Sequence, residues 1–232
     1  MVVDANIAPD AANRTDASAV ARCPHVVFRN VLGTAIVAEL LDFVAARKND
    51  FRSAVVRNRE TGERRVDYGL RNCGYLGDVG TFETPVKAFV CGIAERTMAK
   101  LHLTQPIGAP SDFEIAAYGN GAHFGPHIDT DERLERVRIL SCVYYFAATP
   151  RRFEGGELRL YGLPTLSAKD AAAPPFTDIV PETDTLVAFP SWLRHEVRPV
   201  RVPSGEWADG RFTINCWVHR RNPVAGDVSG GN

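Results

Sequence analysis

The chain has 232 residues, with 27 basic and 28 acidic side chains and a formal net charge of −1. With 45% hydrophobic and 24% charged residues, its composition is that of an ordinary globular protein that can bury a sizeable core. The balanced charge and a pI of 6.6 offer no overall field for phosphates or anionic lipid, so we expect neither nucleic acid nor membrane as a partner. Nothing in the sequence indicates the oligomeric state.

The cysteines and the apolar runs bear on the compartment. Five cysteines are scattered without a CxxC pair: Cys23, Cys73, Cys91, Cys142 and Cys216. This pattern argues against a disulfide framework and a cysteine zinc site, and it favours a reducing cytoplasm. No apolar run approaches the roughly 18 to 20 residues that cross a bilayer, and the N-terminus lacks a basic start followed by an apolar stretch.

We expect one folded domain over residues 23–222. It lies between a flexible lead, residues 1–22, which is rich in Ala, Asp and Asn, and a flexible Gly-rich tail, residues 223–232. Within the domain, residues 23–105 are expected to hold helices and an arginine-rich hairpin. Residues 106–222 are expected to form a core of strands.

Two helices are predicted in the first half. From Thr34 to Arg47, apolar residues recur at helical spacing, namely Ile36, Val37, Leu40, Leu41 and Val44. Thr84 followed by Pro85 predicts an N-cap and a first helical turn. The apolar residues of this second helix are Val86, Phe89, Val90, Ile93 and Met98. Both helices are expected to pack on a sheet.

Between the helices, two short strand-like runs flank residues 60–62 and predict a hairpin or a mobile flap. Residues 47–71 contain eight basic side chains against four acidic ones. This local excess could steer an anionic substrate, or it could be a solvated face. If the flap covers a substrate, Arg57 and Arg59 are the candidate contacts.

After residue 110 the sequence changes to short β-branched and aromatic runs separated by Gly, Pro and Asp. The runs are DFEIAAY, VRILSCVYYF, GELRLY, DTLVAF, HEVRPV and RFTINCWV. They predict an antiparallel, mainly β architecture with supporting helices, either a jelly roll or a barrel, rather than a parallel sheet.

His127 and Asp129 are two residues apart at a predicted strand end, where side chains at i and i+2 share one face. Chance alone gives about 0.4 such pairs in a chain of this composition, so the pair needs a third member. His195, which opens a later strand, is the candidate. Two imidazoles and one carboxylate leave adjacent positions open on an octahedral ion, which suits iron(II) oxygen chemistry. A closed zinc site would want four ligands, mostly thiolates.

Arg211 begins the apolar strand RFTINCWV, sixteen residues after His195. A guanidinium inside a barrel is costly unless it meets an anion, and its planar fork matches a carboxylate. Arg211 is therefore a candidate carboxylate ligand, although it could instead cap the strand at the surface.

Several segments together resemble the iron(II)- and 2-oxoglutarate-dependent dioxygenases, specifically the prolyl 4-hydroxylase-like branch. The segments are YGNGAHFGPHIDTD, LSCVYYF, FEGGELRLY, FPSWLRHEVRPV and RFTINCW, in this order over about residues 112–220. The resemblance implies a double-stranded β-helix, which is a distorted, cupin-like jelly roll. It also implies Fe(II), 2-oxoglutarate and O2, and hydroxylation of a prolyl or other amino-acid unit, free, in a peptide or in a small metabolite.

The resemblance also implies roles for single residues. The iron ligands would be His127, Asp129 and His195. Arg211 would bind the distal carboxylate of 2-oxoglutarate, with Arg198 and Arg201 as competitors because the gap after His195 is longer than in many relatives. Asp129 stands where iron halogenases of this superfamily have a small residue, so hydroxylation is favoured.

Five further residues are predicted at the site or in the core. The resemblance implies a tyrosine that touches the same carboxylate, and the alignment on GGELRLY favours Tyr145 over Tyr144. Alternation along a strand lets only one of the two point inward. Tyr118 and Thr213 are candidates for lining the pocket, or else packed sheet residues. Trp192 and Trp217 are interpreted as core rather than pocket wall.

Two other functions stay open at this point. One is a jelly-roll binding or sensing module without turnover, and the other is a zinc-dependent hydrolase. The arginine-rich flap would suit a carboxylate-bearing amino acid or an acidic peptide as substrate.

Overall fold

The computed structural model describes residues 23–57, 61–130, 137–162 and 175–221. The expected lead and tail, and Arg59 of the hairpin, lie outside these ranges. In the described part, no helix is long and apolar enough to cross a membrane.

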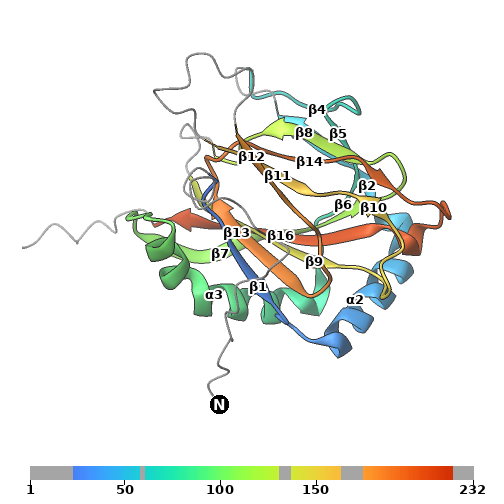
Figure 1. The fold of residues 1–232 in the computed structure, drawn as a ribbon, viewed down its shortest axis with the longest axis horizontal. Coiled ribbons are helices and arrows are strands. Elements are labelled where there is room, and N and C mark those ends of the chain that lie inside the picture. The colour runs from blue at the N-terminus through green and yellow to red at the C-terminus, as the bar shows by residue number, and fades with distance from the viewer. Residues whose placement is uncertain (1–22, 58–60, 131–136, 163–174, 222–232) are drawn as a thin grey trace, which may run out of the picture.

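Two antiparallel sheets, stacked on one another, make up most of the fold (Figure 1). The larger has seven strands in the order β1 (Val26–Arg29), β13 (Thr185–Pro190), β9 (Arg138–Phe146), β16 (Arg211–Arg220), β7 (Ile107–Tyr118), β6 (Gly74–Leu76) and β2 (Arg52–Ser53). The smaller has five, in the order β12 (Phe176–Ile179), β11 (Leu158–Tyr161), β14 (His195–Val197), β8 (His123–His127) and β5 (Arg71–Asn72). This arrangement is a double-stranded β-helix, and the predicted mainly β jelly roll is confirmed.

Two small two-stranded sheets complete the strands. They pair β10 (Glu154–Gly155) with β15 (Val200–Arg201), and β3 (Val55–Arg57) with β4 (Arg64–Val66). The second pair is the hairpin predicted from the arginine-rich segment.

Helices α2 (Thr34–Ala46) and α3 (Glu83–Lys100) lie against the outer face of the larger sheet (Figure 1). Short 3-10 helices are η1 (Lys48–Asp50), η2 (Gly80–Phe82) and η3 (Trp207–Asp209). The apolar stripe predicted for the first helix is the face that packs on the sheet, since Val37, Leu40 and Val44 are buried in the core.

The start of α3 corrects the predicted N-cap. The helix begins at Glu83, so Thr84 lies inside it, and no side chain caps its start. The reason is that η2 runs directly into the helix: the Asp78 carboxylate accepts a hydrogen bond from the Gly80 backbone N–H at 2.9 Å and starts the turn earlier. Pro85 still lies in the first turn, where its missing N–H is harmless.

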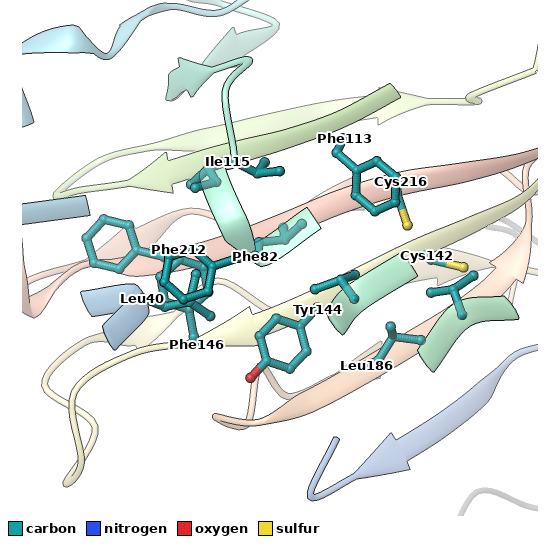
Figure 2. Packing of buried hydrophobic residues seen from close by; sticks show 14 of the residues in the cluster. Leu40, Phe82, Phe113, Ile115, Cys142, Tyr144, Phe146, Leu186, Phe212 and Cys216 are labelled. Atoms are coloured by element: carbon teal, nitrogen blue, oxygen red, sulfur yellow. The ribbon is translucent and has the colours of Figure 1, made fainter. Parts of the chain in front are cut away.

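Alternation along the central strands gives the larger sheet two different faces. On its outer face, β9 and β16 contribute Cys142, Tyr144, Phe146, Phe212, Ile214 and Cys216 to the core under the helices (Figure 2). Between the sheets, the same strands contribute Ser141, Val143, Tyr145, Arg211, Thr213, Asn215 and Trp217. The apolar face stabilises the fold, and the polar face is available for chemistry.

Candidate metal and cosubstrate site

His127, Asp129 and His195 come together on the smaller sheet. His127 ends β8 and His195 begins β14, and the two are direct cross-strand partners. Asp129 follows two residues after β8, where its backbone N–H donates to the Ser191 carbonyl at 2.9 Å. The Asp129 Oδ1 atom lies 3.5 Å from His127 Nε2 and 3.6 Å from His195 Nε2. All three ligand atoms fall within 4.8 Å of one another, which is a spacing that one metal ion can bridge.

Each imidazole is oriented in the same way. The Nδ1 atom of His127 bonds to the Gly125 carbonyl, and that of His195 bonds to the Leu193 carbonyl, both at 2.8 Å. Because a carbonyl only accepts, Nδ1 carries the proton in each ring and Nε2 keeps its lone pair. Such a second hydrogen bond fixes the tautomer and orientation of metal-binding histidines.

Aromatic rings hold these imidazoles from the side. The Phe124 ring stacks on His127 with centroids 3.6 Å apart and an angle of 14°. The edge of Phe189 meets His195 at 4.7 Å. Neither ring therefore needs to reorganise before binding a metal.

Asp129 divides its two oxygens between the protein and the metal position. The Oδ2 atom accepts hydrogen bonds from the Ser141 hydroxyl at 2.6 Å and from the Trp217 indole N–H at 2.9 Å. This leaves Oδ1 facing the two histidines. The three free ligand atoms are two imidazole nitrogens and one carboxylate oxygen, which fits iron(II).

The protonation states also fit a metal site. Burial opposes ionisation of Asp129, but the nearby imidazoles of His195 and His127 and the hydrogen bond from the Ser141 hydroxyl hold the pKa of Asp129 well below its usual value. Burial and the neighbouring His127 lower the pKa of His195 to about 4, although Asp129 opposes this shift. Near neutral pH the ligands are therefore a carboxylate and a neutral imidazole, as metal binding requires.

Arg211 lies in the interior between the sheets. Only 1% of its surface is exposed, so the surface-cap interpretation does not hold. Its competitors are elsewhere: Arg198 pairs with Glu196, and Arg201 pairs with Glu154, each in a part-exposed position. Of the three candidate arginines, only Arg211 faces the cleft between the sheets.

Gly156 makes room for this arginine. A Cβ at Gly156 would approach Arg211 Cδ to 2.8 Å and Val200 Cγ2 to 2.9 Å, and the glycine has φ +72°. No other residue type fits both the space and the backbone conformation. The second glycine of the FEGGELRLY segment thus permits burial of the guanidinium.

The surroundings of Arg211 contain unused hydrogen-bonding groups. Within the described part of the chain, Arg211 Nε and Nη1, the Tyr145 hydroxyl and the Thr213 hydroxyl are buried without a hydrogen-bond partner. Thr213 and Tyr145 are direct cross-strand partners, and the Tyr145 ring lies 4.9 Å from Arg211 Cζ. Leaving such groups unpaired is costly, so their clustering indicates a ligand with several acceptor oxygens.

The aromatic residues around Arg211 remain neutral. Tyr118, its partner on β7, presents its ring 4.6 Å from Arg211 Cζ and lines the cleft. Tyr145 does not line the cleft, and its ring packs with Leu158 behind the guanidinium. Burial raises the pKa of both phenols, although the charge of Arg211 opposes the shift. Both hydroxyls therefore keep their protons as possible donors.

Neither tryptophan has the simple core position predicted for it. Trp217 is buried, but it lines the cleft and donates to Asp129, so it is not simple core. Trp192 is 40% exposed. The role of Ser141 was also missed, although its i, i+4 spacing to Tyr145 on one strand places it on the same inner face.

The metal position and Arg211 lie in one cleft of about 1310 Å³. Its lining also includes β3 and β4 residues, so the arginine-rich hairpin borders the same space. The cleft therefore has three parts: a metal position, a buried cationic end and an outer wall formed by the hairpin.

Residues 113–219 match the family model described as the 2OG-Fe(II) oxygenase superfamily. A curated relative, an uncharacterized PKHD-type hydroxylase of Synechocystis sp., is 34% identical over 113 residues. That match covers 49% of this chain and 37% of the relative. The matched region therefore spans a little over a third of the relative's length.

Two solved structures share the fold at low sequence identity. A Pseudomonas putida prolyl-4-hydroxylase has a TM-score of 0.58 and 19% identity, and the match covers 88% of this chain and 97% of that one. A Trichoplax adhaerens prolyl hydroxylase, in complex with a peptide fragment of the hypoxia inducible factor oxygen degradation domain, has a TM-score of 0.58 and 18% identity over 88% and 86% of the two chains.

Proposed function

We propose that the chain is a member of the 2OG-Fe(II) oxygenase superfamily, whose model matches residues 113–219, and that it is a dioxygenase that hydroxylates an unactivated C–H bond. The substrate C–H, O2 and 2-oxoglutarate would give the alcohol, succinate and CO2. One oxygen atom enters the product alcohol and the other enters succinate. The observation that carries the proposal is that the His127, Asp129 and His195 group lines the same cleft as the buried Arg211, two of whose nitrogens have no hydrogen-bond partner among the described residues.

His127, Asp129 and His195 would hold the iron. Bound iron(II) supplies positions where a keto acid can chelate and O2 can be activated. The protein contributes orientation, because the Gly125 and Leu193 carbonyls, Ser141 and Trp217 already hold the three ligands. Asp129 supplies the carboxylate ligand at the position where halogenases of the superfamily have a small residue. Its presence supports hydroxylation.

Arg211 would bind the distal carboxylate of 2-oxoglutarate. Its planar fork matches a carboxylate at two points, and the pairing would satisfy donors that are otherwise buried and unused. The hydroxyls of Thr213 and Tyr145 would add hydrogen bonds to the same group. The Tyr118 ring covers the guanidinium and keeps water away from the ion pair.

The substrate would be a prolyl or other amino-acid unit. The two structural neighbours are prolyl hydroxylases, one of which binds a peptide, and this supports a peptide as the substrate of this chain. Because fold alone does not fix the substrate class, the proposal of a peptide substrate also rests on the cleft volume of about 1310 Å³. All five cysteines are free, which supports the cytoplasmic location proposed from the sequence.

An anaerobic titration tests the cosubstrate assignment. The iron(II)-loaded protein is titrated with 2-oxoglutarate while the visible charge-transfer absorption of the chelate is recorded. We expect the band to appear, and Arg211→Ala to need about a hundredfold more keto acid, because a buried ion pair loses one partner.

Arg201→Ala is the matched control, since it removes an exposed arginine that pairs with Glu154 outside the cleft. It should titrate like the wild type. If iron binds and no band forms, the 2-oxoglutarate assignment is wrong, and a binding module or a zinc hydrolase becomes the better explanation.

A further inference from the structure

The β3–β4 hairpin places two arginines directly opposite each other. The register pairs Val55 with Val66 and Arg57 with Arg64, so these four side chains share one face. Figure 1 shows β4 at the smaller-sheet side of the molecule. Val55, Arg57 and Arg64 all line the cleft that contains the metal position.

This arginine pair is unfavourable by itself. Like charges directly opposite each other on neighbouring strands destabilise the pairing. In the described part of the chain, neither Arg57 nor Arg64 forms an ion pair. Arg65, on the opposite face of the same strand, does pair with Asp67 at 3.0 Å. Within its described residues, the hairpin therefore neutralises the arginine that points away from the cleft and leaves the two that border it without an ion pair.

Among the described residues, the rest of the cleft does not compensate these charges. The acidic residues of its described lining are Asp112, Glu114 and Asp129. Glu114 binds Arg71 at 3.1 Å and Asn215 at 3.2 Å, and Asp112 pairs with Arg138 at 3.6 Å. Asp129 belongs to the metal group. Among the described lining residues, Arg52 and Arg194 also lack an ion pair, so the cleft holds an excess of positive charge.

The hairpin is connected to the metal position through Arg71. This buried guanidinium donates from Nη1 to the Val55 carbonyl at 3.4 Å and from Nη2 to Glu114 at 3.1 Å. Its Cζ lies 4.7 Å from the Phe124 ring, which stacks on His127. A group bound at the hairpin is therefore held at a defined place relative to the ligand histidines.

The face with the arginine pair also offers apolar contact. Val55 and Val66 are 37% and 43% exposed, which is unusual for valines paired across a hairpin. A carboxylate on a short apolar stem, as in Glu or Asp, would meet both the valines and the arginines. A free phosphate ion would pair with the two arginines but would make no apolar contact with the valines.

We propose that this hairpin recognises acidic side chains of a polypeptide substrate, beside the residue that is oxidised. The proposal rests on the proposed function, because it assigns the substrate class of the same cleft. A polypeptide is favoured over a free amino acid because the cleft, at about 1310 Å³, exceeds the roughly 300 to 1,000 Å³ typical of small-molecule sites. Arg57 and Arg64 would determine specificity, and Arg71 would position the hairpin.

Binding of labelled peptides tests this assignment. The probes are fluorescein-labelled peptides with a central proline flanked on both sides by glutamates, and matched peptides with glutamine or lysine instead. The protein is loaded with manganese(II) and 2-oxoglutarate so that no turnover occurs, and anisotropy is measured at low and high salt. We expect the glutamate peptide to bind about tenfold more tightly than the glutamine peptide at low salt, and this preference to shrink at high salt.

Charge variants locate the effect. Arg57→Gln with Arg64→Gln should remove the preference for glutamate, and Arg57→Glu with Arg64→Glu should transfer it to the lysine peptide. The control is Arg96→Gln with Arg151→Gln, which removes two exposed arginines that do not line the cleft. The control should bind as the wild type does, although it loses the same net charge.

Each outcome decides the proposal. Equal binding of the three peptides to the wild type, or an equal loss in the control, would overturn it. Displacement of the glutamate peptide by free glutamate at matched carboxylate concentration would assign the site to a small anionic substrate instead. The proposed function fails separately, since it requires succinate from 2-oxoglutarate in the iron-loaded protein, and the anisotropy measurement does not depend on turnover.

Discussion

The two faces of the seven-stranded sheet are built from the same strands but have opposite chemistry. On the outer face, residues such as Tyr144 and Phe146 are buried against α2 and α3. The polar atom that its strands bury is paired: the Tyr144 hydroxyl donates to Asp184 at 2.9 Å, and Asp184 also accepts from the backbone N–H groups of Leu32 and Gly33 before α2.

The inner face keeps polar groups that have no partner among the described residues. Arg211, Thr213 and Tyr145 are as deeply buried as their neighbours on the outer face, yet each has a hydrogen-bonding atom that no described residue uses. Burial without partners lowers stability, so a fold retains it where a ligand supplies the missing contacts. The comparison therefore predicts that changes on the outer face alter stability, and changes on the inner face alter ligand binding.

The largest effect is expected from Asp129→Ala. The substitution removes the one carboxylate from the metal group and leaves only two imidazoles, so iron(II) binding and succinate formation should fall below detection. Circular dichroism should show the wild-type fold, because no apolar contact of the outer face is lost. Retention of iron-dependent succinate formation in this variant would contradict the ligand assignment.

On the outer face, Leu40→Ala should cost about 2–5 kcal/mol of unfolding free energy, because Leu40 is fully buried between α2 and the sheet. Urea unfolding measures this loss. At a temperature where the variant is folded, its affinity for 2-oxoglutarate should equal that of the wild type. A weaker affinity with unchanged stability would show that the two faces are not independent.

Trp217→Phe should weaken metal binding about 10- to 100-fold, as expected when the hydrogen-bond donor to a metal-binding carboxylate is removed. The measurement is competition for iron(II) or manganese(II) against a chelator. Trp207→Phe is the matched control, because within the described residues the buried Trp207 indole N–H has no hydrogen-bond partner. Equal metal affinity in both variants would show that Trp217 does not contribute to metal binding.

The smallest effect comes from two adjacent tyrosines. Tyr145→Phe removes a hydroxyl beside Arg211 and should weaken 2-oxoglutarate binding about fivefold, the value of one ordinary hydrogen bond. Tyr144→Phe removes the hydrogen bond to Asp184 and should lower unfolding free energy by about 1 kcal/mol without changing that affinity. Chelate absorption measures the affinity and urea unfolding measures the stability of both variants. If Tyr144→Phe weakened 2-oxoglutarate binding and Tyr145→Phe lowered only stability, the assignment of the two tyrosines to the two faces would be wrong.

Local patterns of the sequence determined the strand-end position of two metal ligands, the alternation of the two tyrosines and the first helix. The i, i+2 spacing of His127 and Asp129 placed both at one strand end, and strand alternation required that only one of Tyr144 and Tyr145 point inward, because both depend only on the geometry of an extended chain. The apolar stripe of Thr34–Ala46 likewise predicted the helix. These features involve residues that are close in sequence, so pattern alone decides them.

Contacts between distant segments were decided only by the tertiary structure. Trp217 reaches Asp129 across 88 positions of the chain, and Gly156 accommodates Arg211, although no local pattern distinguishes either residue from core or turn. The register that sets Arg57 opposite Arg64 also depends on how two strands align. Composition located an excess of arginine in this segment. Only packing could decide which of those arginines are neutralised and which face the cleft, because charge pairing depends on distances in space.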